Sequence, residues 1–343
     1  MDSLTQFALG ASVALMVTAR RHAPRQAAWK IALVGGVVGT LPDLDAFIDF
    51  GDAISNMVRH RAETHGFFYA TLASPLIAYL VSKWLGDSRR FVTWCLAVWL
   101  ILVTHVGLDL LTIYGTQIAQ PFNDTAFGVG SLFVIDPLYT LPLILGLVVT
   151  IIRSGPKGLR WNTFGLVFSS AYILWSLGAH QHATDIAKKH PPTDDQSMKI
   201  LVSAAPLTTV LWRAVAVTPD VYYEGWYSLL DPEPKFSWQA YPRNAALIQR
   251  YELRQDVARI ARFTHGFFRL EEAYGKLFVT DLRLGLEPYY SFRFDLGDPN
   301  ELPTIRSQRV GVRPDLAGGL PWLWHRIQGN PITLTDYVRA SSR

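Results

Sequence analysis

The chain has 343 residues, of which 50% are hydrophobic and 17% are charged, and its mean hydropathy is +0.16. These values depart from those of soluble globular proteins and favour a membrane protein. The net charge of +4 does not indicate a nucleic-acid partner, because basic residues between apolar runs record membrane orientation. With Cys95 as its single cysteine, the chain cannot form an intrachain disulfide.

Six apolar runs in the first half of the chain predict membrane-spanning helices, for which about 20 apolar residues are needed. The second run is short because Pro42 interrupts it. We expect an α-helical multi-span membrane domain of about six helices. It occupies residues 1–185, with spans at residues 4–19, 29–41, 67–85, 91–114, 132–152 and 163–179.

Basic residues alternate from loop to loop along this half, and short loops rich in Lys and Arg stay in the cytoplasm. The loops on the other side hold only Arg59 and Arg61. We therefore expect the N-terminus and the C-terminal region outside the cytoplasm. The residues that carry this prediction are Arg20, Arg21, Arg25, Lys30, Lys83, Arg89, Arg90, Arg153, Lys157 and Arg160.

The C-terminal region follows a polar segment at residues 191–195, and its hydrophobic period changes from helical to alternating. Strands are predicted at residues 210–217, 222–229, 276–284 and 289–295, with a helix at residues 244–262. We expect a small α+β, mainly antiparallel, extramembrane domain over residues 186–343 on the extracytoplasmic side.

Seven acidic and histidine residues of the membrane half fall at the outer ends of the predicted spans. They are Asp43, Asp45, His60, His65, His105, Asp109 and Asp136. The segment from His105 to Asp109 places an imidazole and a carboxylate four residues apart, on one face of a helix. Ionisable groups within a span cost about 2.5–3.5 kcal/mol and usually face a cavity or a partner. Their convergence predicts a bound cation.

Mixed imidazole and carboxylate ligands suit zinc, and also manganese or iron, whereas magnesium and calcium favour oxygen alone. We expect one or two divalent ions, with zinc as the first choice. Alternatives stay open for single residues. His105 is also compatible with a neutral core histidine, Asp109 with a cap or salt bridge, and Asp43 with a turn after Pro42.

Several short motifs follow one another in order along the membrane half. They are residues 1–6 with Gly10, residues 41–45, His60 and Arg61 with Thr64 and His65, residues 104–105 and 108–109, residues 114–117 and 121–122, and residues 135–139. This ordered set resembles the bacterial membrane-bound metal-dependent hydrolases, the YdjM-like inner-membrane proteins, over residues 1–180. Many relatives have histidine where this chain has Gln6, so the resemblance leaves any ligand role of that position open.

The resemblance implies a multi-pass protein of the bacterial inner membrane and a metal-dependent hydrolase. The ligands that it carries over are Asp43, Asp45, His60, His65, His105 and Asp109. Their order is also similar, more distantly, to the ligand pattern of zinc-dependent phospholipase C. That similarity implies phosphoester chemistry at a membrane surface, with a membrane lipid or lipid-linked molecule as substrate.

Three further residues are candidates for catalytic roles in such a hydrolase. Arg61 offers bidentate donors that would stabilise developing negative charge, although anchoring at the headgroups explains it equally well. Glu63 is a candidate general base, and no spacing favours it over Asp43 or Asp136.

A metal-binding transporter or non-catalytic membrane module is the alternative, because intramembrane carboxylates and histidines also mark ion pathways. The sequence shows no matching ligand set on the cytoplasmic side and no inverted repeat, and both observations count against this alternative. Serine-hydrolase, zincin and nucleotide-binding functions lack their defining motifs.

Overall fold

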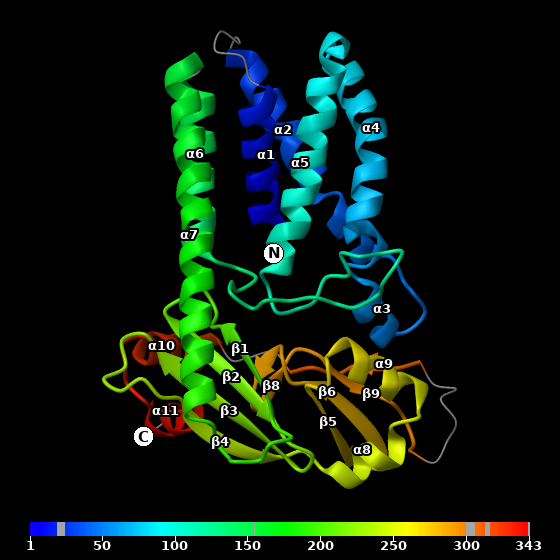
Figure 1. The fold of residues 1–343 in the computed structure, drawn as a ribbon, viewed down its shortest axis with the longest axis vertical. Helices are drawn as coiled ribbons and strands as arrows, with labels where there is room; N and C mark the ends of the chain where they lie inside the picture. Colours follow the sequence, from blue (N-terminus) through cyan, green and yellow to red (C-terminus); the bar gives the residue numbers. More distant parts are fainter. Residues whose placement is uncertain (19–24, 154, 300–305, 313–315, 342–343) are drawn as a thin grey trace. The chain divides into compact units, whose positions relative to one another are not determined.

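A computed structural model of the chain describes residues 1–18, 25–153, 155–299, 306–312 and 316–341 (Figure 1). The chain forms two compact units. The first contains Met1–Ile48, Arg59–Leu177 and Pro206–Thr208, and the second contains Asp49–Val58, Gly178–Ala205 and Thr209–Arg343. The division at residue 185 stays a prediction. Arg20 and Arg21, which support the predicted orientation, lie outside the described residues.

The first unit is helical, and its long helices lie side by side (Figure 1). Three short 3-10 turns, η1 (Pro42–Phe47), η2 (Glu63–His65) and η3 (Ser88–Arg90), connect them. The long helices are α1 (Ser3–Thr18), α2 (Arg25–Thr40), α4 (Phe67–Trp84), α5 (Phe91–Leu110), α6 (Pro137–Arg153) and α7 (Gly155–Lys189), the last of which continues into the second unit.

Large apolar side chains point outward from these helices. Leu72, Leu76 and Leu80 of α4 are 58–68% exposed, and Leu141 and Leu145 of α6 are 53% and 61% exposed. Water would make such rows of leucine unfavourable, whereas lipid would not, since contiguous apolar surface marks a site of contact with a partner or a membrane. These rows on α4 and α6 therefore indicate a surface that contacts a membrane or a partner.

All six predicted spans correspond to helices. Among the described residues, one helix, Ser88–Leu110, is long and apolar enough to cross a membrane, and Ser3–Thr18, Ala28–Thr40 and Pro137–Arg153 are shorter apolar helices. The number of six spans is therefore not confirmed and stays a prediction.

Two predicted helix boundaries were wrong. The fourth helix ends at Leu110 instead of residue 114, because the backbone N–H groups of Leu111 and Thr112 bond three residues back, to Leu108 and Asp109, and the α-helical pattern stops there. The helix predicted from residue 132 begins at Pro137, where Asp136 caps it.

Glycines bring the backbones of α1 and α2 into direct contact. A Cβ atom at Gly10 would lie 2.9 Å from the Cα of Gly39, and one at Gly39 would lie 2.8 Å from the carbonyl oxygen of Gln6. Small residues at such spacing allow close helix packing in membranes. This approach fixes the end of α2, and with it the position of the Gly39 carbonyl.

The second unit contains two antiparallel four-stranded sheets. The first has the order β1 (Lys199–Ala204), β2 (Leu211–Val217), β3 (Val221–Ser228) and β4 (Ser237–Pro242). The second has the order β10 (Gln308–Arg309), β9 (Arg293–Asp295), β6 (Lys276–Asp281) and β5 (Phe268–Ala273). β7 (Gly285–Leu286) and β8 (Tyr289–Tyr290) form a separate pair, and the helices are α3 (Ala53–Arg59), α8 (Ala245–Tyr251), α9 (Gln255–Phe263), α10 (Leu316–Ile327) and α11 (Leu334–Ser341).

These sheets confirm an antiparallel C-terminal domain with helices. The predicted strands appear as β2, β3 and β6, while the fourth is divided into β8 and β9. The single predicted helix at residues 244–262 was wrong. It is broken into α8 and α9, because Arg254 has an extended backbone, with a φ of −67° and a ψ of 125°.

We expect the Gly10→Ala substitution to destabilise the first unit by about 1–3 kcal/mol, because the added methyl group overpacks the contact between α1 and α2. Thermal unfolding of the purified protein in detergent would show a lower Tm. Gly107→Ala is the matched control, since Gly107 of α5 has open space around its Cβ position. An equal effect of both substitutions would contradict the packing argument.

Candidate metal centre

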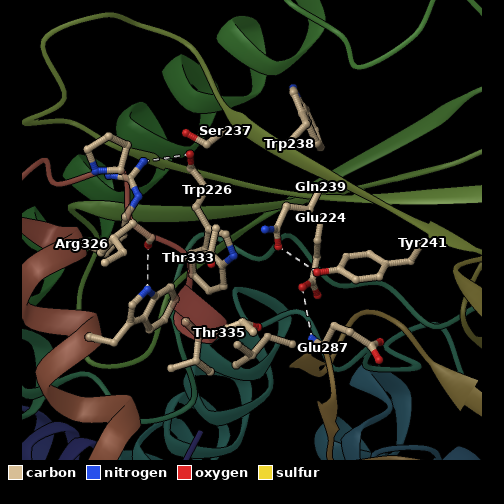
Figure 2. A pocket seen from close by; sticks show the side chains of 15 residues that line it. Glu224, Trp226, Ser237, Trp238, Gln239, Tyr241, Glu287, Arg326, Thr333 and Thr335 are labelled. Carbon is tan, nitrogen blue, oxygen red and sulfur yellow. Dashed lines mark hydrogen bonds between the residues drawn. The ribbon is translucent and has the colours of Figure 1, made fainter. Parts of the chain in front are cut away.

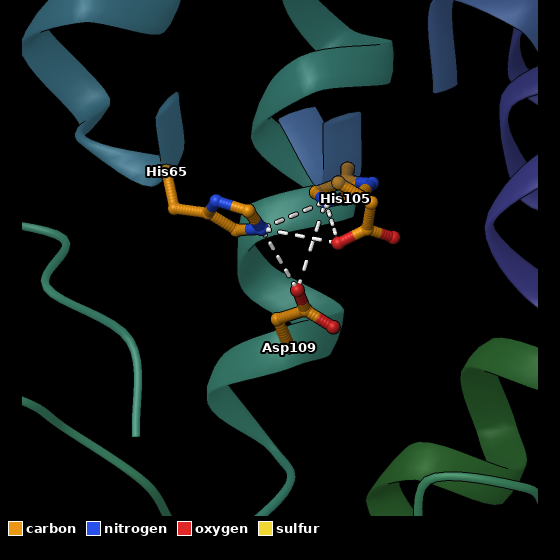
Figure 3. Close-up of side chains that lie close together, drawn as sticks. His65, His105 and Asp109 are labelled. Atoms are coloured by element: carbon orange, nitrogen blue, oxygen red, sulfur yellow. Dashed lines mark hydrogen bonds and ion pairs between the residues drawn. The ribbon is translucent and has the colours of Figure 1, made fainter. Parts of the chain in front are cut away.

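Two histidines and two aspartates meet in the first unit (Figure 3). Asp43 comes from η1, His65 from η2, and His105 and Asp109 from the end of α5. One ligand atom of each residue lies within 4.8 Å of the ligand atoms of the other three. Asp43 is 16% exposed, and the other three side chains are at most 1% exposed.

The distances between these atoms match the edges of a zinc coordination sphere. Nε2 of His65 lies 3.1 Å from Nε2 of His105, 3.1 Å from Oδ2 of Asp109 and 3.5 Å from Oδ1 of Asp43. Nε2 of His105 lies 3.6 Å from Oδ2 of Asp109 and 3.7 Å from Oδ1 of Asp43. Zinc bonds of about 2.0–2.1 Å in a tetrahedron give edges of about 3.3–3.4 Å. The four atoms thus surround a point where a small cation fits.

Hydrogen bonds on the far side of each imidazole determine which nitrogen faces the centre. Nδ1 of His105 lies 2.7 Å from the carbonyl oxygen of Gly39, which can only accept, so we assign the proton to Nδ1 and the lone pair to Nε2. Nδ1 of His65 lies 2.9 Å from Oγ1 of Thr64, whose hydroxyl donates to Asp45 at 2.6 Å. Both Nε2 atoms therefore face the centre, where that of His65 offers a lone pair once the ring has lost its second proton.

Asp45 does not belong to the cluster, but its hydrogen bonds organise the loop that carries His65. Its carboxylate accepts from Thr64 and from the backbone N–H of Arg61 at 3.0 Å, and it lies 2.7 Å from Nδ1 of His60. Burial raises the pKa of Asp45, but its hydrogen bonds to His60, His65 and Thr64 outweigh burial and hold that pKa well below the usual value. Asp45 and His60 thus form a pair beside the four-residue cluster.

Several positive and polar groups surround the buried carboxylate of Asp109. Nε of Arg61 lies 3.2 Å from its Oδ2, Nε2 of Gln6 donates to its Oδ1 at 3.1 Å, and the amino group of Met1 also contacts it. The side-chain oxygen of Gln6 is buried and has no hydrogen-bond partner among the described residues. An unsatisfied oxygen beside the cluster is a further sign that a cation belongs there.

Arg61 is held in a conformation that few residues adopt. Its φ is 65°, in the left-handed region that costs an L-residue of this size free energy unless its surroundings enforce it. Nη1 donates to Thr112 at 3.0 Å, and the guanidinium lies 5.0 Å from the ring centre of Tyr114. The strained backbone and the tight packing hold the Arg61 guanidinium beside the cluster, where it could contact an anionic ligand.

The carboxylates of the cluster favour positive charge on His65, in addition to the charge that Arg61 brings to Asp109. Burial lowers the pKa of His65, but contacts with Asp109, Asp43 and Asp45 outweigh burial and raise it to about 9. For Asp43, burial raises the pKa, but the hydrogen bond to His65 and the nearby His105 outweigh it and lower the pKa. At neutral pH both carboxylates favour a positive charge on His65. The ring carries this charge as a proton, which leaves when an ion binds.

Two predicted catalytic residues lie outside this arrangement. Glu63 is exposed and pairs with Arg59 at 2.7 Å. Asp136 is buried, accepts from the backbone N–H of Leu138 at 3.0 Å and from the hydroxyl of Tyr172 at 3.0 Å, and thereby caps α6. Each has a structural role that explains its position.

The sequence did not reveal two groups that orient the ligands. Thr64 links Asp45 to His65, although the sequence analysis identified it only as part of a motif. The carbonyl oxygen of Gly39 orients His105, and a backbone carbonyl has no signature in the sequence. Only the position of Gly39 at the end of an apolar run, close to Pro42, could have drawn attention to it.

Comparison with known proteins agrees with the sequence motifs. The family model described as YdjM inner membrane protein matches residues 1–183, which include all four residues of the cluster. The chain is also similar to the uncharacterized protein YfhP of Bacillus subtilis (strain 168), with 23% identity over 191 residues. The alignment covers 54% of each protein, so the chain spans about half the length of that relative. No solved structure matches the chain.

Replacing His105 by Ala or Asp109 by Asn should reduce the zinc retained by the purified protein at least about tenfold, because each change removes a ligand and leaves the remaining charges unbalanced. Mass spectrometry of the metal content measures this loss. The exposed His190 offers the control His190→Ala, which should retain zinc as the wild type does. Retention equal to wild type in both ligand variants would contradict the site.

Metal affinity should increase with pH. Because the pKa of His65 is raised to about 9, its ring is protonated at neutral pH and must release a proton before Nε2 can bind an ion. We expect the zinc affinity to rise about tenfold per unit between about pH 6 and 8. Calorimetric titration in two buffers of different ionisation enthalpy would count the released proton. Binding without proton release would refute this assignment.

Proposed function

The chain belongs to the family of YdjM inner membrane proteins, and from this membership and the metal centre we propose that it is a metal-dependent hydrolase of the inner membrane. One observation carries the proposal. The lone pairs of two oriented imidazoles and two carboxylates are directed at one point, in a spacing suited to a small cation.

His65, His105 and Asp109 would hold the ion, and zinc suits their nitrogen and oxygen donors, with manganese or iron as alternatives. A bound ion of this kind lowers the pKa of water towards neutrality and polarises a phosphoryl or carbonyl oxygen of the substrate. Catalytic zinc sites combine three protein ligands with a water molecule, and such an arrangement would leave Asp43, the fourth residue of the cluster, for another role.

We assign the role of general base to Asp43. It is the member of the cluster that solvent reaches, and its Oδ1 is also the atom farthest from the two imidazoles, at 3.5 and 3.7 Å. Because its pKa is lowered, the carboxylate is ionised at neutral pH and can accept a proton from the attacking water. Glu63, which pairs with Arg59, and Asp136, which caps α6, lack this position.

Arg61 favours a phosphoester over a carboxylic ester as the bond that is cleaved. Its guanidinium is nearly buried beside Asp109, and a planar donor of this kind binds phosphate oxygens in pairs. The charge on a phosphoryl group grows as water attacks, so a fixed arginine stabilises the transition state. Asp45 supports this role because it accepts from the backbone N–H of Arg61.

The substrate that we propose is a membrane lipid or lipid-linked molecule. The support is the apolar outer surface of α4 and α6 together with the membership of an inner-membrane family. We also propose six membrane spans within residues 1–185, with the active site and the C-terminal domain on the extracytoplasmic side. A distant likeness to zinc-dependent phospholipase C is part of the same proposal.

Purified protein should hydrolyse phosphodiester or phospholipid substrates, and a chelator should abolish the turnover. The Asp43→Asn variant should retain zinc and lose at least about 100-fold in kcat, because general-base catalysis contributes about 10²–10⁴-fold. Arg61→Lys should lower kcat/KM about 10- to 100-fold, since a lysine cannot bind phosphate in the bidentate manner.

Arg59→Lys provides the control for the arginine, because Arg59 is exposed and pairs with Glu63 away from the cluster. It should keep wild-type activity. Zinc binding without turnover on any phosphoester would refute the hydrolase and favour the metal-binding transporter or non-catalytic module.

A further inference from the structure

A pocket of about 210 Å³ opens in the second unit, on one face of the first sheet (Figure 2). All of its lining residues lie between positions 224 and 335, beyond the segment that matches the family. Neither the metal centre nor the family membership accounts for it.

The floor of the pocket comes from two paired strands. Glu224 of β3 lies opposite Gln239 of β4, and Trp226 lies opposite Ser237, so their side chains project from the same face. The other face of this sheet is covered by the end of α7, where Ala183 packs in one cluster with other buried apolar residues. The pocket is therefore on the face that α7 leaves open.

The walls are formed by segments that pack against this face at either end. Glu287, which follows β7, lines one side. Trp322 and Arg326 of α10 line the other, together with residues 331–335. In Figure 2, Gln239, Tyr241 and Glu287 lie next to the carboxylate of Glu224, and Arg326 lies farther from it.

Each charged group that lines the pocket already has an opposite charge beside it. Glu224 accepts from Nε of Arg213 at 3.0 Å, Glu287 lies 3.3 Å from Arg269, and Arg326 donates to Asp231 at 2.6 Å. These pairs are fixed within the fold, so the pocket attracts neither a cation nor an anion strongly. Glu224 is also engaged on both oxygens, because Oε1 accepts from Tyr290 and Oε2 accepts from the backbone N–H of Glu287, so it shapes the floor and its charge is satisfied.

Aromatic rings flank the polar floor, and the protein itself holds them in place. Tyr241 stacks on Tyr222 at 5.3 Å between ring centres, and its hydroxyl donates to Gln239 at 2.8 Å. Trp226 packs edge-on against Trp322 at 5.0 Å. Rings that are ordered before a ligand arrives cost little entropy on binding.

We propose that this pocket binds a neutral, hydroxyl-rich ring, that is, one sugar unit. The C–H groups of a sugar ring pack on aromatic faces, while its hydroxyls require acceptors and donors such as the exposed lining residues Ser237, Gln239 and Thr335. A volume of 210 Å³ is below the roughly 300–1,000 Å³ of pockets for drug-sized ligands, and this favours a single ring. The inference goes beyond the proposed hydrolase and does not depend on a bound metal.

The test uses the full chain in phospholipid nanodiscs, because detergents with sugar headgroups would compete for the pocket. Saturation-transfer NMR is recorded with glucose, galactose, mannose and N-acetylglucosamine, each with and without a chelator. We expect transfer to at least one sugar, and the chelator should not change it. The absence of transfer to all four sugars would overturn the proposal, whether or not a cation such as tetramethylammonium shows transfer.

Gln239→Ala tests the position of the site, because Gln239 is an exposed residue of the edge strand β4 and its replacement should leave the fold intact. Loss of one hydrogen bond to the sugar should weaken binding about three- to tenfold. Gln328→Ala is the matched control, since Gln328 is exposed and does not line the pocket. Equal affinity of wild type and Gln239→Ala would place any sugar binding elsewhere and refute this site.

Discussion

The buried carboxylate of Asp109 is the constraint on which the first unit depends. A carboxylate without exposure to solvent costs several kcal/mol unless charged or polar partners surround it. Here the partners come from distant segments: Gln6 from α1, Arg61 from the loop after α3, and His65 from η2. Neutralising one charge therefore requires these segments to dock together, and their docking also assembles the ligands of the proposed ion.

The precision of the cluster originates in a second layer of contacts. The carbonyl oxygen of Gly39 orients His105, and Thr64 orients His65, so each imidazole presents the nitrogen that can bind a metal. Gly39 occupies its place because Gly10 allows α1 and α2 to touch. Helix packing and metal affinity are thereby coupled, although the glycines lie outside the ligand set.

The second unit solves a similar problem with a buried ion pair. Arg213 is almost inaccessible to solvent, and it bonds to Glu224 as well as to the backbone carbonyl of Leu282. Glu224 also accepts from Tyr290 at 2.9 Å, which connects the first sheet to the β7–β8 pair. The network satisfies both charges, and it keeps a carboxylate oriented in the floor of the pocket.

The sequence by itself determined what depends on local chemistry. Hydrophobic period and length placed the six long helices of the first half and five of the ten described strands, and the four-residue spacing placed His105 and Asp109 on one helix face, because these features need only neighbouring residues. The tertiary structure decided which candidates meet. It brought His65 to Asp109 across 44 residues, paired Asp45 with His60, left Glu63 at the surface and used Asp136 as a cap. Packing between distant segments and backbone carbonyls governs those choices, and neither is written in the spacing of residue types.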